Sequence, residues 1–256
     1  MRIISWNINS IGRRFDELKQ LVESYDHDYV CLQKVRNNSG REKFSVDGYH
    51  PMFTVCDYGD MSGVMTYAKI ESGIDPILQW DNFPKRILTP ELSQDGHLQV
   101  YRADNFYLIN AYVPYANAQI EGAAYFRNVW DSKFKELVIN LSKELPVIIC
   151  GDLNIVHTKK DTCEDKLIQN RPCFSQWERD NFDRLLAEAD LADAFRELHP
   201  DSEAPTYFGN FRFLKTGNRI DYFIVSRSIL SKVTDSEILN DFGTGQSVPI
   251  TLDIEL

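Results

Sequence analysis

Eight short apolar runs, many of them rich in valine, isoleucine and tyrosine, are spread along the whole chain. β-Branched and aromatic residues favour strands, so these runs predict β-strands. They cover residues 3–8, 29–32, 63–67, 98–101, 106–113, 146–150, 220–225 and 250–254. Between them, apolar residues at helical spacing predict helices within 15–22, 121–143 and 182–189. Strands that alternate with amphipathic helices restrict the chain to an α/β architecture.

The order of these elements also limits the topology. Some strands follow one another closely and others are separated by helices, which favours mixed sheets over a doubly wound parallel sheet. With 256 residues, the chain is short for two α/β domains and long enough for one domain with a large core. We therefore predict a single domain over residues 1–256, with two packed mixed β-sheets and helices outside them.

The overall charge limits the partners that the chain can bind. It has 28 basic residues against 38 acidic ones, which gives a net charge of −10 at pH 7. Because binding to a phosphate backbone gains from cations, this charge argues against broad, non-specific nucleic-acid binding. The net charge is still compatible with a local basic face, to which Arg13 and Arg14 could contribute.

The sequence also has features of a cytoplasmic protein. No apolar run approaches the ~18 residues that a membrane span needs, and the first residues lack the layout of a signal peptide. The five cysteines include no C-x-x-C pair, which argues against a zinc cluster or a disulfide framework. We therefore expect reduced thiols, a cytoplasmic location and no membrane contact.

Polar side chains gather where predicted strands end, which is where α/β proteins build their sites. Asn7 and Asn9 end the first strand, Asp152 and Asn154 follow a wholly apolar run, and Asp221 lies inside an apolar strand. Asparagine and aspartate also favour turns and caps, so a purely structural role is an open alternative for Asn9 and Asn154. Asp221 differs, because a buried carboxylate is costly unless a cation, a donor network or a metal compensates it.

These oxygen-bearing side chains suit metal-assisted chemistry. Carboxylates at strand ends are typical ligands of a hard ion such as Mg²⁺. Mg²⁺ with a carboxylate base and a polarising histidine is a common arrangement for phosphodiester hydrolysis, because charge develops on the phosphoryl oxygens and the leaving group.

Six segments, taken in order, resemble the exonuclease III / AP endonuclease family of the endonuclease–exonuclease–phosphatase superfamily. They are ISWNINSI, NAYVP, YFRNVWDSKF, VIICGDLNIVH, WERDNFDRLL and NRIDYFIVS. The resemblance runs over essentially the whole chain and implies a four-layer α/β/β/α sandwich. It also implies hydrolysis of phosphodiesters beside abasic sites and at the 3′ ends of duplex DNA, with Mg²⁺ or Mn²⁺ as the cofactor.

The resemblance implies a role for five side chains. Asn7 matches the asparagine that steadies the metal and the catalytic carboxylates, and Asp152 matches the aspartate that positions or deprotonates the attacking water. Asn7 and Asp152 are thus the candidate metal residues. Tyr112 matches a tyrosine near the phosphate, Asn154 an asparagine that contacts it, and Asp221 the aspartate partnered with the region of the catalytic histidine.

Further side chains around the same edge are candidates for nucleic-acid contacts. Tyr207, with Phe208, keeps the aromatic character of one wall of the abasic-sugar pocket. The candidates are Asn7, Asn9, Arg13, Tyr115, Tyr207, Asn218 and Ser247.

The chain departs from the family pattern at the positions that carry the chemistry. The family has a metal-binding glutamate where this chain has Lys34. Alignment on Pro249 places Gln246 where an aspartate is expected and Ser247 where the catalytic histidine is expected. Two further departures replace an asparagine with Tyr115 and a pocket tryptophan with Asn218.

Lys34 follows the apolar stretch VCLQ, so it lies at the end of a buried strand. We expect its ammonium to point into the former metal site and to neutralise Asp152 or Asp221, in which case no metal is bound. A protonated lysine is no ligand for Mg²⁺, and burial beside carboxylates favours the charged form. The alternative is that Lys34 turns outward along the loop with Arg36.

Three functions are consistent with these residues. The first is a DNA-repair phosphodiesterase that acts on abasic or 3′-end DNA and is weak or impaired at the replaced positions. The second is an inactive pseudo-nuclease that binds DNA, RNA or a protein. The third is a regulatory or scaffold protein without a nucleic-acid role, which the net charge allows.

Overall fold

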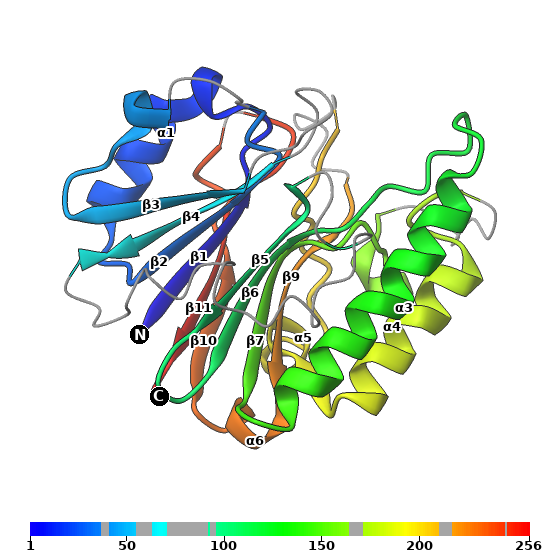
Figure 1. Ribbon diagram of the computed structural model, residues 1–256. Helices are drawn as coiled ribbons and strands as arrows, with labels where there is room; N and C mark the ends of the chain where they lie inside the picture. The colour runs from blue at the N-terminus through cyan, green and yellow to red at the C-terminus, as the bar shows by residue number, and fades with distance from the viewer. Residues whose placement is uncertain are drawn as a thin grey trace.

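The computed structural model describes residues 1–36, 41–54, 63–70, 92, 96–163, 171–209, 217–243 and 245–256. Within these ranges the chain forms two β-sheets that pack face to face, with helices on their outer faces (Figure 1). The predicted α/β sandwich of two mixed sheets with helices outside is therefore confirmed.

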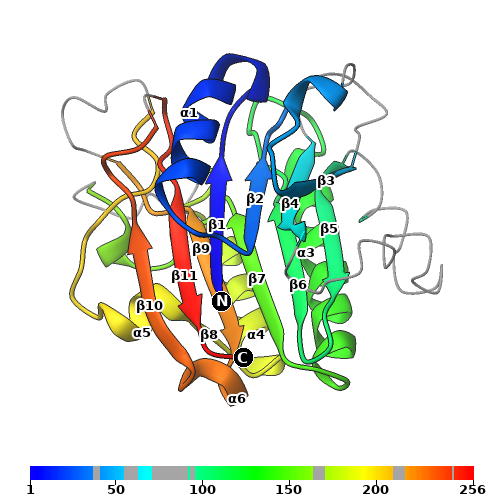
Figure 2. The same ribbon diagram turned by 90° about the vertical axis from the view of Figure 1, so that its left-hand side faces the viewer.

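The first sheet has six strands, and Figure 2 shows it with α1 in front. In spatial order its strands are β10 (Val233–Ile238), β11 (Ile250–Ile254), β1 (Arg2–Asn7), β2 (Tyr29–Gln33), β4 (Val64–Lys69) and β3 (Tyr49–Thr54). β1 and β2 run parallel, and Asn7 lies opposite Gln33 in their register. The other neighbours in this sheet are antiparallel.

The second sheet has five strands. Their order is β5 (Leu98–Arg102), β6 (Tyr107–Tyr112), β7 (Val147–Asp152), β9 (Asp221–Ser226) and β8 (Leu191–Asp193). β6 and β7 run parallel with Tyr112 opposite Asp152, and the antiparallel strand β9 places Asp221 on the other side of Asp152. Each sheet is therefore mixed, and the last residues of β6 and β7 lie beside the first residue of β9.

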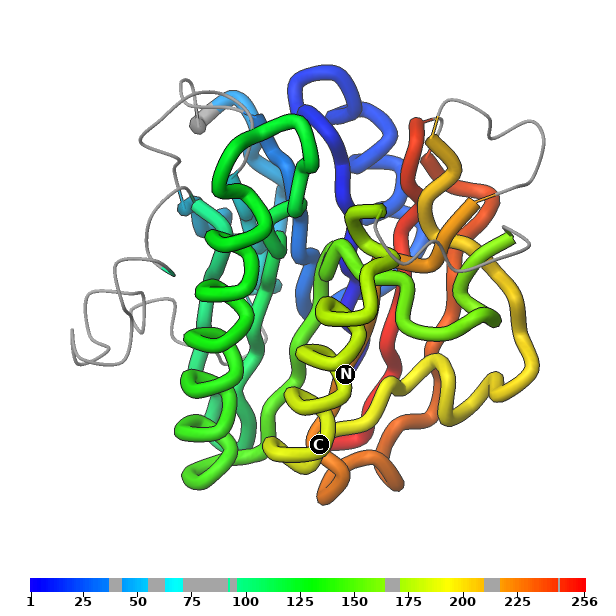
Figure 3. Tube along the Cα trace, turned by 90° about the vertical axis from the view of Figure 1, so that its right-hand side faces the viewer, coloured from blue at the N-terminus to red at the C-terminus, as the bar shows by residue number. Residues whose placement is uncertain are grey.

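Helices cover the outer faces of the sheets. α1 (Ile11–Ser24) packs its apolar side on the six-stranded sheet. α3 (Ala123–Ser142) and α4 (Gln176–Glu188) lie side by side on the five-stranded sheet, as Figure 3 shows. The shorter helices are α5 (Ala194–Leu198), α6 (Arg227–Leu230) and the 3₁₀ turns η1 (Arg41–Phe44) and η4 (Lys159–Asp161). None of the helices in the described ranges is long and apolar enough to cross a membrane.

A chain of buried amides, with one threonine hydroxyl, crosses the space between the sheets. Gln33 of β2 donates to Asn110 Oδ1 of β6 at 2.8 Å, and Asn110 donates to Thr66 Oγ1 of β4 at 3.0 Å. Thr66 in turn donates to Gln99 Oε1 of β5 at 2.9 Å. The four residues belong alternately to the two sheets, so these hydrogen bonds join one sheet to the other. Hydrogen-bonded buried polar groups of this kind favour one arrangement of the core, and among the described residues only Gln33 Oε1 of this chain lacks a donor.

Candidate active-site cleft

A cleft of about 720 Å³ opens beside the ends of β1, β2, β6 and β7. Seven of the predicted site residues line it, together with Lys34. The seven are Asn7, Tyr112, Tyr115, Asp152, Asn154, Tyr207 and Asn218. The fold therefore brings together most of the side chains that the sequence singled out.

Asp152 ends β7 and is 3% exposed. Its Oδ2 accepts a hydrogen bond from Asn7 Nδ2 at 2.7 Å, and its Oδ1 accepts one from the backbone N–H of Asn154 at 2.9 Å. Burial raises the pKa of this carboxyl to about 6, because these hydrogen bonds and the charges of Lys34 and Arg127 only partly offset the loss of hydration. Asp152 thus changes its charge close to neutral pH.

Asp221 lies opposite Asp152 across the β7–β9 pair, and it is buried and does not line the cleft. Its Oδ2 accepts a hydrogen bond from Thr206 Oγ1 at 2.6 Å. Burial and the nearby charge of Asp152 raise the pKa of Asp221 well above its ordinary value. The family resemblance implied a partner in the histidine region, where Ser247 stands. The structure instead gives Asp221 a threonine partner, which the sequence analysis missed because Thr206 lies in a loop without a motif.

Lys34 directly follows β2 and has a left-handed backbone conformation, with φ of 55°. Its side chain is half-buried and lines the cleft. Burial and the positive charge of Arg36 lower the pKa of Lys34, and the charge of Asp152 acts in the opposite direction. Among the residues that the structure describes, Lys34 forms no direct ion pair with a carboxylate. The structure therefore places Lys34 in the same cleft wall as Asp152, without the ion pair to Asp152 or Asp221 that we expected from the sequence.

The left-handed conformation recurs around the cleft. Asn9, Lys34, Arg36, Asn154 and Cys173 all have φ between 47° and 69°, a range that non-glycine residues rarely adopt. Such conformations persist only where the surrounding structure imposes them, and they are frequent at functional sites. The loops that follow the strands at the cleft are therefore held in backbone conformations that the surrounding structure imposes.

Arg127 of α3 supplies much of that restraint. Its guanidinium donates to the carbonyl oxygen of Pro114 at 2.8 Å and to that of Leu153 at 3.1 Å, and it pairs with Asp131 at 2.7 Å. These bonds tie the loops after β6 and β7 to one helix. The sequence analysis did not assign Arg127 to the site, although this arginine stands in the matching segment YFRNVWDSKF; the structure shows that it is buried, at 3% exposure. Asn154 is fixed by the same loops, because its Nδ2 donates to Val113 O at 2.8 Å.

Aromatic side chains form part of the cleft wall. Tyr112 stacks on His97 with ring centroids 5.3 Å apart, and burial raises the pKa of Tyr112. Tyr115, 47% exposed, lies at the rim, where Arg171 covers the ring of Phe174 at 4.7 Å. Flat rings and a guanidinium at an open rim are suited to stacking on nucleobases.

Asn218 occupies the position where the resemblance implied a tryptophan. Its Oδ1 accepts a hydrogen bond from Thr162 at 2.7 Å, and its backbone pairs with that of Tyr207. The wall beside Tyr207 is therefore polar at this point.

Three of the predicted contact residues lie outside the wall of this cleft. Asn9 Nδ2 donates to Gln246 Oε1 at 3.3 Å, which joins the loop after β1 to the loop before β11. Ser247 is buried at 4% exposure, and its carbonyl oxygen accepts a hydrogen bond from Trp6 Nε1 at 3.3 Å. Arg13 is exposed on α1. Asn9 and Ser247 thus form hydrogen bonds within the protein, and Arg13 is the one of the three whose side chain faces solvent.

The described residues do not fit a resident Mg²⁺ ion. None of the described histidine, cysteine, aspartate and glutamate side chains form a group of three that could hold a metal. Both oxygens of Asp152 already accept hydrogen bonds, and the amine of Lys34 lies in the same wall. A protonated amine there repels a cation and cannot ligate it. Asn7 Oδ1, which accepts no hydrogen bond from the described residues, is one remaining oxygen donor.

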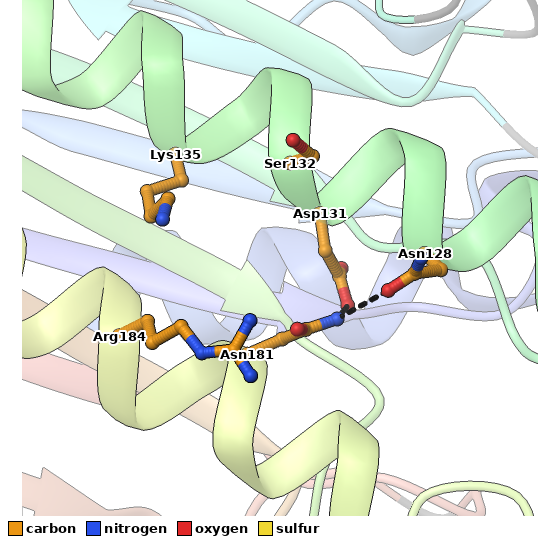
Figure 4. A pocket seen from close by; sticks show the side chains of 6 residues that line it. All are labelled: Asn128, Asp131, Ser132, Lys135, Asn181 and Arg184. Atoms are coloured by element: carbon orange, nitrogen blue, oxygen red, sulfur yellow. Dashed lines mark hydrogen bonds between the residues drawn. The ribbon is translucent and has the colours of Figure 1, made fainter.

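A second polar pocket, of about 160 Å³, lies between α3 and α4 (Figure 4). There Asn181 of α4 donates to Asn128 at 3.0 Å and to Asp131 at 3.2 Å, both on α3. Lys135 pairs with Glu188 at 2.7 Å. Because these groups bond to one another across the two helices, we assign the pocket to helix packing.

Comparisons with known proteins agree with the resemblance seen in the motifs. A model of the endonuclease/exonuclease/phosphatase family matches residues 4–242. The exodeoxyribonuclease of Bacillus subtilis (strain 168) is 30% identical over the full length of both chains. The DNA repair nuclease APEX1 of Danio rerio is 31% identical over 98% of this chain and 81% of its own.

Solved structures show the same fold. An AP endonuclease from Archaeoglobus fulgidus superposes over the whole of both chains with a TM-score of 0.85 at 18% identity. The 3′-5′ exonuclease NExo from Neisseria meningitidis also covers both chains, with a TM-score of 0.84 at 22% identity.

Proposed function

Because the chain belongs to the endonuclease/exonuclease/phosphatase family, we propose that it binds abasic or 3′-end duplex DNA in this cleft and is impaired in metal-dependent hydrolysis. Its fold is that of exodeoxyribonucleases and AP endonucleases. The proposal treats residues 1–256 as one domain. The core shared by the two sheets and the chain of amides between them support that treatment.

The observation that carries the proposal is the amine in the cleft wall. Lys34 lies near Asp152, at the position where the family pattern has a metal-binding glutamate. With lysine in place of this glutamate, the site lacks a carboxylate ligand for Mg²⁺ and gains an amine that repels the ion when it is protonated. Ser247, at the position where the family pattern has the catalytic histidine, supports the same conclusion, because a hydroxyl cannot exchange protons near neutral pH as an imidazole does.

The cleft still carries several groups that suit contacts with DNA. Asn7 and Asn154 are fixed beside Asp152, and Tyr112 lies in the same wall. Arg171 offers a cation to a phosphate, and Tyr115 offers a ring to a base or sugar at the rim. The cleft is therefore better equipped for binding than for hydrolysis.

The test is cleavage of a duplex that carries one tetrahydrofuran analogue of an abasic site, with Mg²⁺ and then with Mn²⁺. Loss of one preorganised electrophilic group commonly slows a reaction by ~10²–10³, and such losses do not add within one catalytic unit. We expect a rate at least about 10³ below that of the Bacillus subtilis exodeoxyribonuclease measured in parallel. Asp152→Asn serves as the control for contaminating nucleases.

A second variant makes the result decisive. The triple substitution Lys34→Glu, Gln246→Asp and Ser247→His restores the family pattern, so we expect it to gain metal-dependent cleavage. Fluorescence anisotropy on the same duplex measures binding by the unmodified chain. Rapid Mg²⁺-dependent cleavage that Asp152→Asn abolishes would refute the impairment. Absence of DNA binding at low salt would favour a regulatory or protein-binding role.

A further inference from the structure

Lys34 is the single lysine in the wall of the cleft, within the part of the chain that the structure describes. Its amine has no carboxylate partner there, whereas several partly exposed lysines form ion pairs, among them Lys69, Lys133 and Lys135. An unpaired amine in a cleft is available to react with a ligand as well as to attract it. This availability suggests a chemical role.

We propose that Lys34 is a nucleophile toward the open-chain aldehyde of an abasic site, so that the protein cuts the strand by elimination and without a metal. This inference rests on the proposed function, because it needs abasic DNA in the cleft. Elimination differs from the family's hydrolysis in the bond that breaks, which is the C3′–O bond and not the P–O bond.

The surroundings of Lys34 favour this role. β1 and β2 are parallel neighbours with Asn7 opposite Gln33, so Lys34 directly follows the residue paired with Asn7. Asn7 lines the same cleft, and its buried Oδ1 accepts no hydrogen bond from the described residues. An oxygen acceptor of that kind can receive the N–H of the iminium that forms on the lysine.

The electrostatic environment supports the geometry. Burial and Arg36 both lower the pKa of the Lys34 amine, which raises the fraction that is neutral and able to attack. Lysines that form Schiff bases with carbonyl substrates are activated in this way, by desolvation or by another cation.

The reaction balances without an oxidant, a reductant or a metal. The Lys34 nitrogen forms a bond to C1′ of the aldehyde, and a water molecule leaves to give the iminium. Loss of the C2′ proton to water gives an enamine. The electrons of the enamine then shift to form the C2′–C3′ double bond and expel the 3′ phosphate. This phosphate remains as the 5′ phosphate of the next nucleotide. One water molecule then hydrolyses the imine, which frees Lys34 and leaves an unsaturated aldehyde at the 3′ end of the upstream fragment of the cut strand.

The experiment is borohydride trapping on a duplex with a natural abasic site, in the presence of EDTA. Borohydride reduces the iminium to a stable amine, so we expect a covalent protein–DNA adduct whose modified peptide contains Lys34. Lys34→Arg and Lys34→Gln should lose at least nine-tenths of the adduct. Lys133→Ala, on the exposed face of α3, should keep it. Thermal melting of each variant checks that it is folded.

The tetrahydrofuran duplex separates this inference from the proposed function, because the analogue can be bound but has no aldehyde. Binding of that duplex without any adduct on the natural site would overturn the inference and leave the proposed function intact. An adduct that survives in Lys34→Arg would also overturn it. Absence of binding to either duplex would refute both.

Discussion

The two buried carboxylates, Asp152 and Asp221, face each other across neighbouring strands, each with few compensating groups. Asp152 has two hydrogen-bond donors and the charges of Lys34 and Arg127, neither of which bonds to it directly, and Asp221 has Thr206. At the scale of residues, burial therefore dominates both pKa values and works against ionisation. The folded protein carries an electrostatic cost in the cleft at neutral pH.

We predict that Asp152→Asn stabilises the protein above pH 6. The folded pKa of Asp152 is raised to about 6 against about 3.9 unfolded, so the folded state holds the proton more tightly. The stability of the parent therefore falls as the pH rises from about 4 through 6 and is constant above that range. The amide has no such dependence. Asn7 can flip so that its Oδ1, which accepts no hydrogen bond from the described residues, accepts one from the new N–H group.

Urea unfolding between pH 4 and pH 8 measures this effect. The gain in free energy of unfolding should be near zero at pH 4 and about 2–3 kcal/mol at pH 7.5. Asp16→Asn, an exposed substitution on α1, is the control. A difference that does not change with pH would contradict the pKa assignment.

At the scale of elements, α3 acts as a clamp on the strand ends that carry the site. Arg127 reaches from this helix to carbonyl oxygens in the loops after β6 and β7. It is also 4.0 Å from Glu178 of α4, which is itself buried and bonded to Ser175. Arg127 therefore links the loops after β6 and β7 to α3 and contacts α4 as well.

We predict that Arg127→Ala lowers the free energy of unfolding by about 3–5 kcal/mol, because it leaves buried carbonyl oxygens and carboxylates without their cation. Arg127→Lys should recover less than half of the loss, since an ammonium cannot reproduce the planar fork of donors. Lys133→Ala on the same helix should change stability by less than about 0.5 kcal/mol, because its pair with Glu136 is exposed. Equal effects at positions 127 and 133, measured by urea unfolding, would rule out the clamp.

At the scale of the whole molecule, a net charge of −10 surrounds a cleft whose wall contains Lys34 and Arg171. Arg36 adds a third positive charge close to Lys34 and Tyr112. The acidic remainder of the surface repels DNA that approaches elsewhere, so binding should concentrate at the cleft. The charge distribution thus favours local contacts over a broad footprint.

We predict a shallow dependence of DNA affinity on salt. Two to three neutralised phosphates give a slope of log K against log salt of about −2 to −3. Arg171→Ala should reduce the magnitude of that slope by about 1, because it removes one phosphate contact. Anisotropy titrations from 50 to 300 mM salt test both values. A slope steeper than about −5 would place most of the contacts outside the described cleft.

The sequence predicted the central strands and most of the cleft, because their apolar runs and polar ends are local signals. β3, β8 and β10 were missed. All three lie at sheet edges, and β8 has only three residues while β3 and β10 carry exposed side chains. The bond from Thr206 to Asp221 and the reach of Arg127 join positions far apart in the chain. No pattern of spacing encodes such contacts, so they required the structure.

The buried amide of Gln33 has an evolutionary consequence. Gln33 is fully buried and secures the end of β2 through Ser5 and Asn110, whereas the next residue already belongs to the cleft wall. Glutamate and lysine codons differ by a single base, so a lineage can exchange one for the other at position 34 while every core contact persists. Natural selection can therefore change the chemistry of this protein at position 34 without the loss of a core contact.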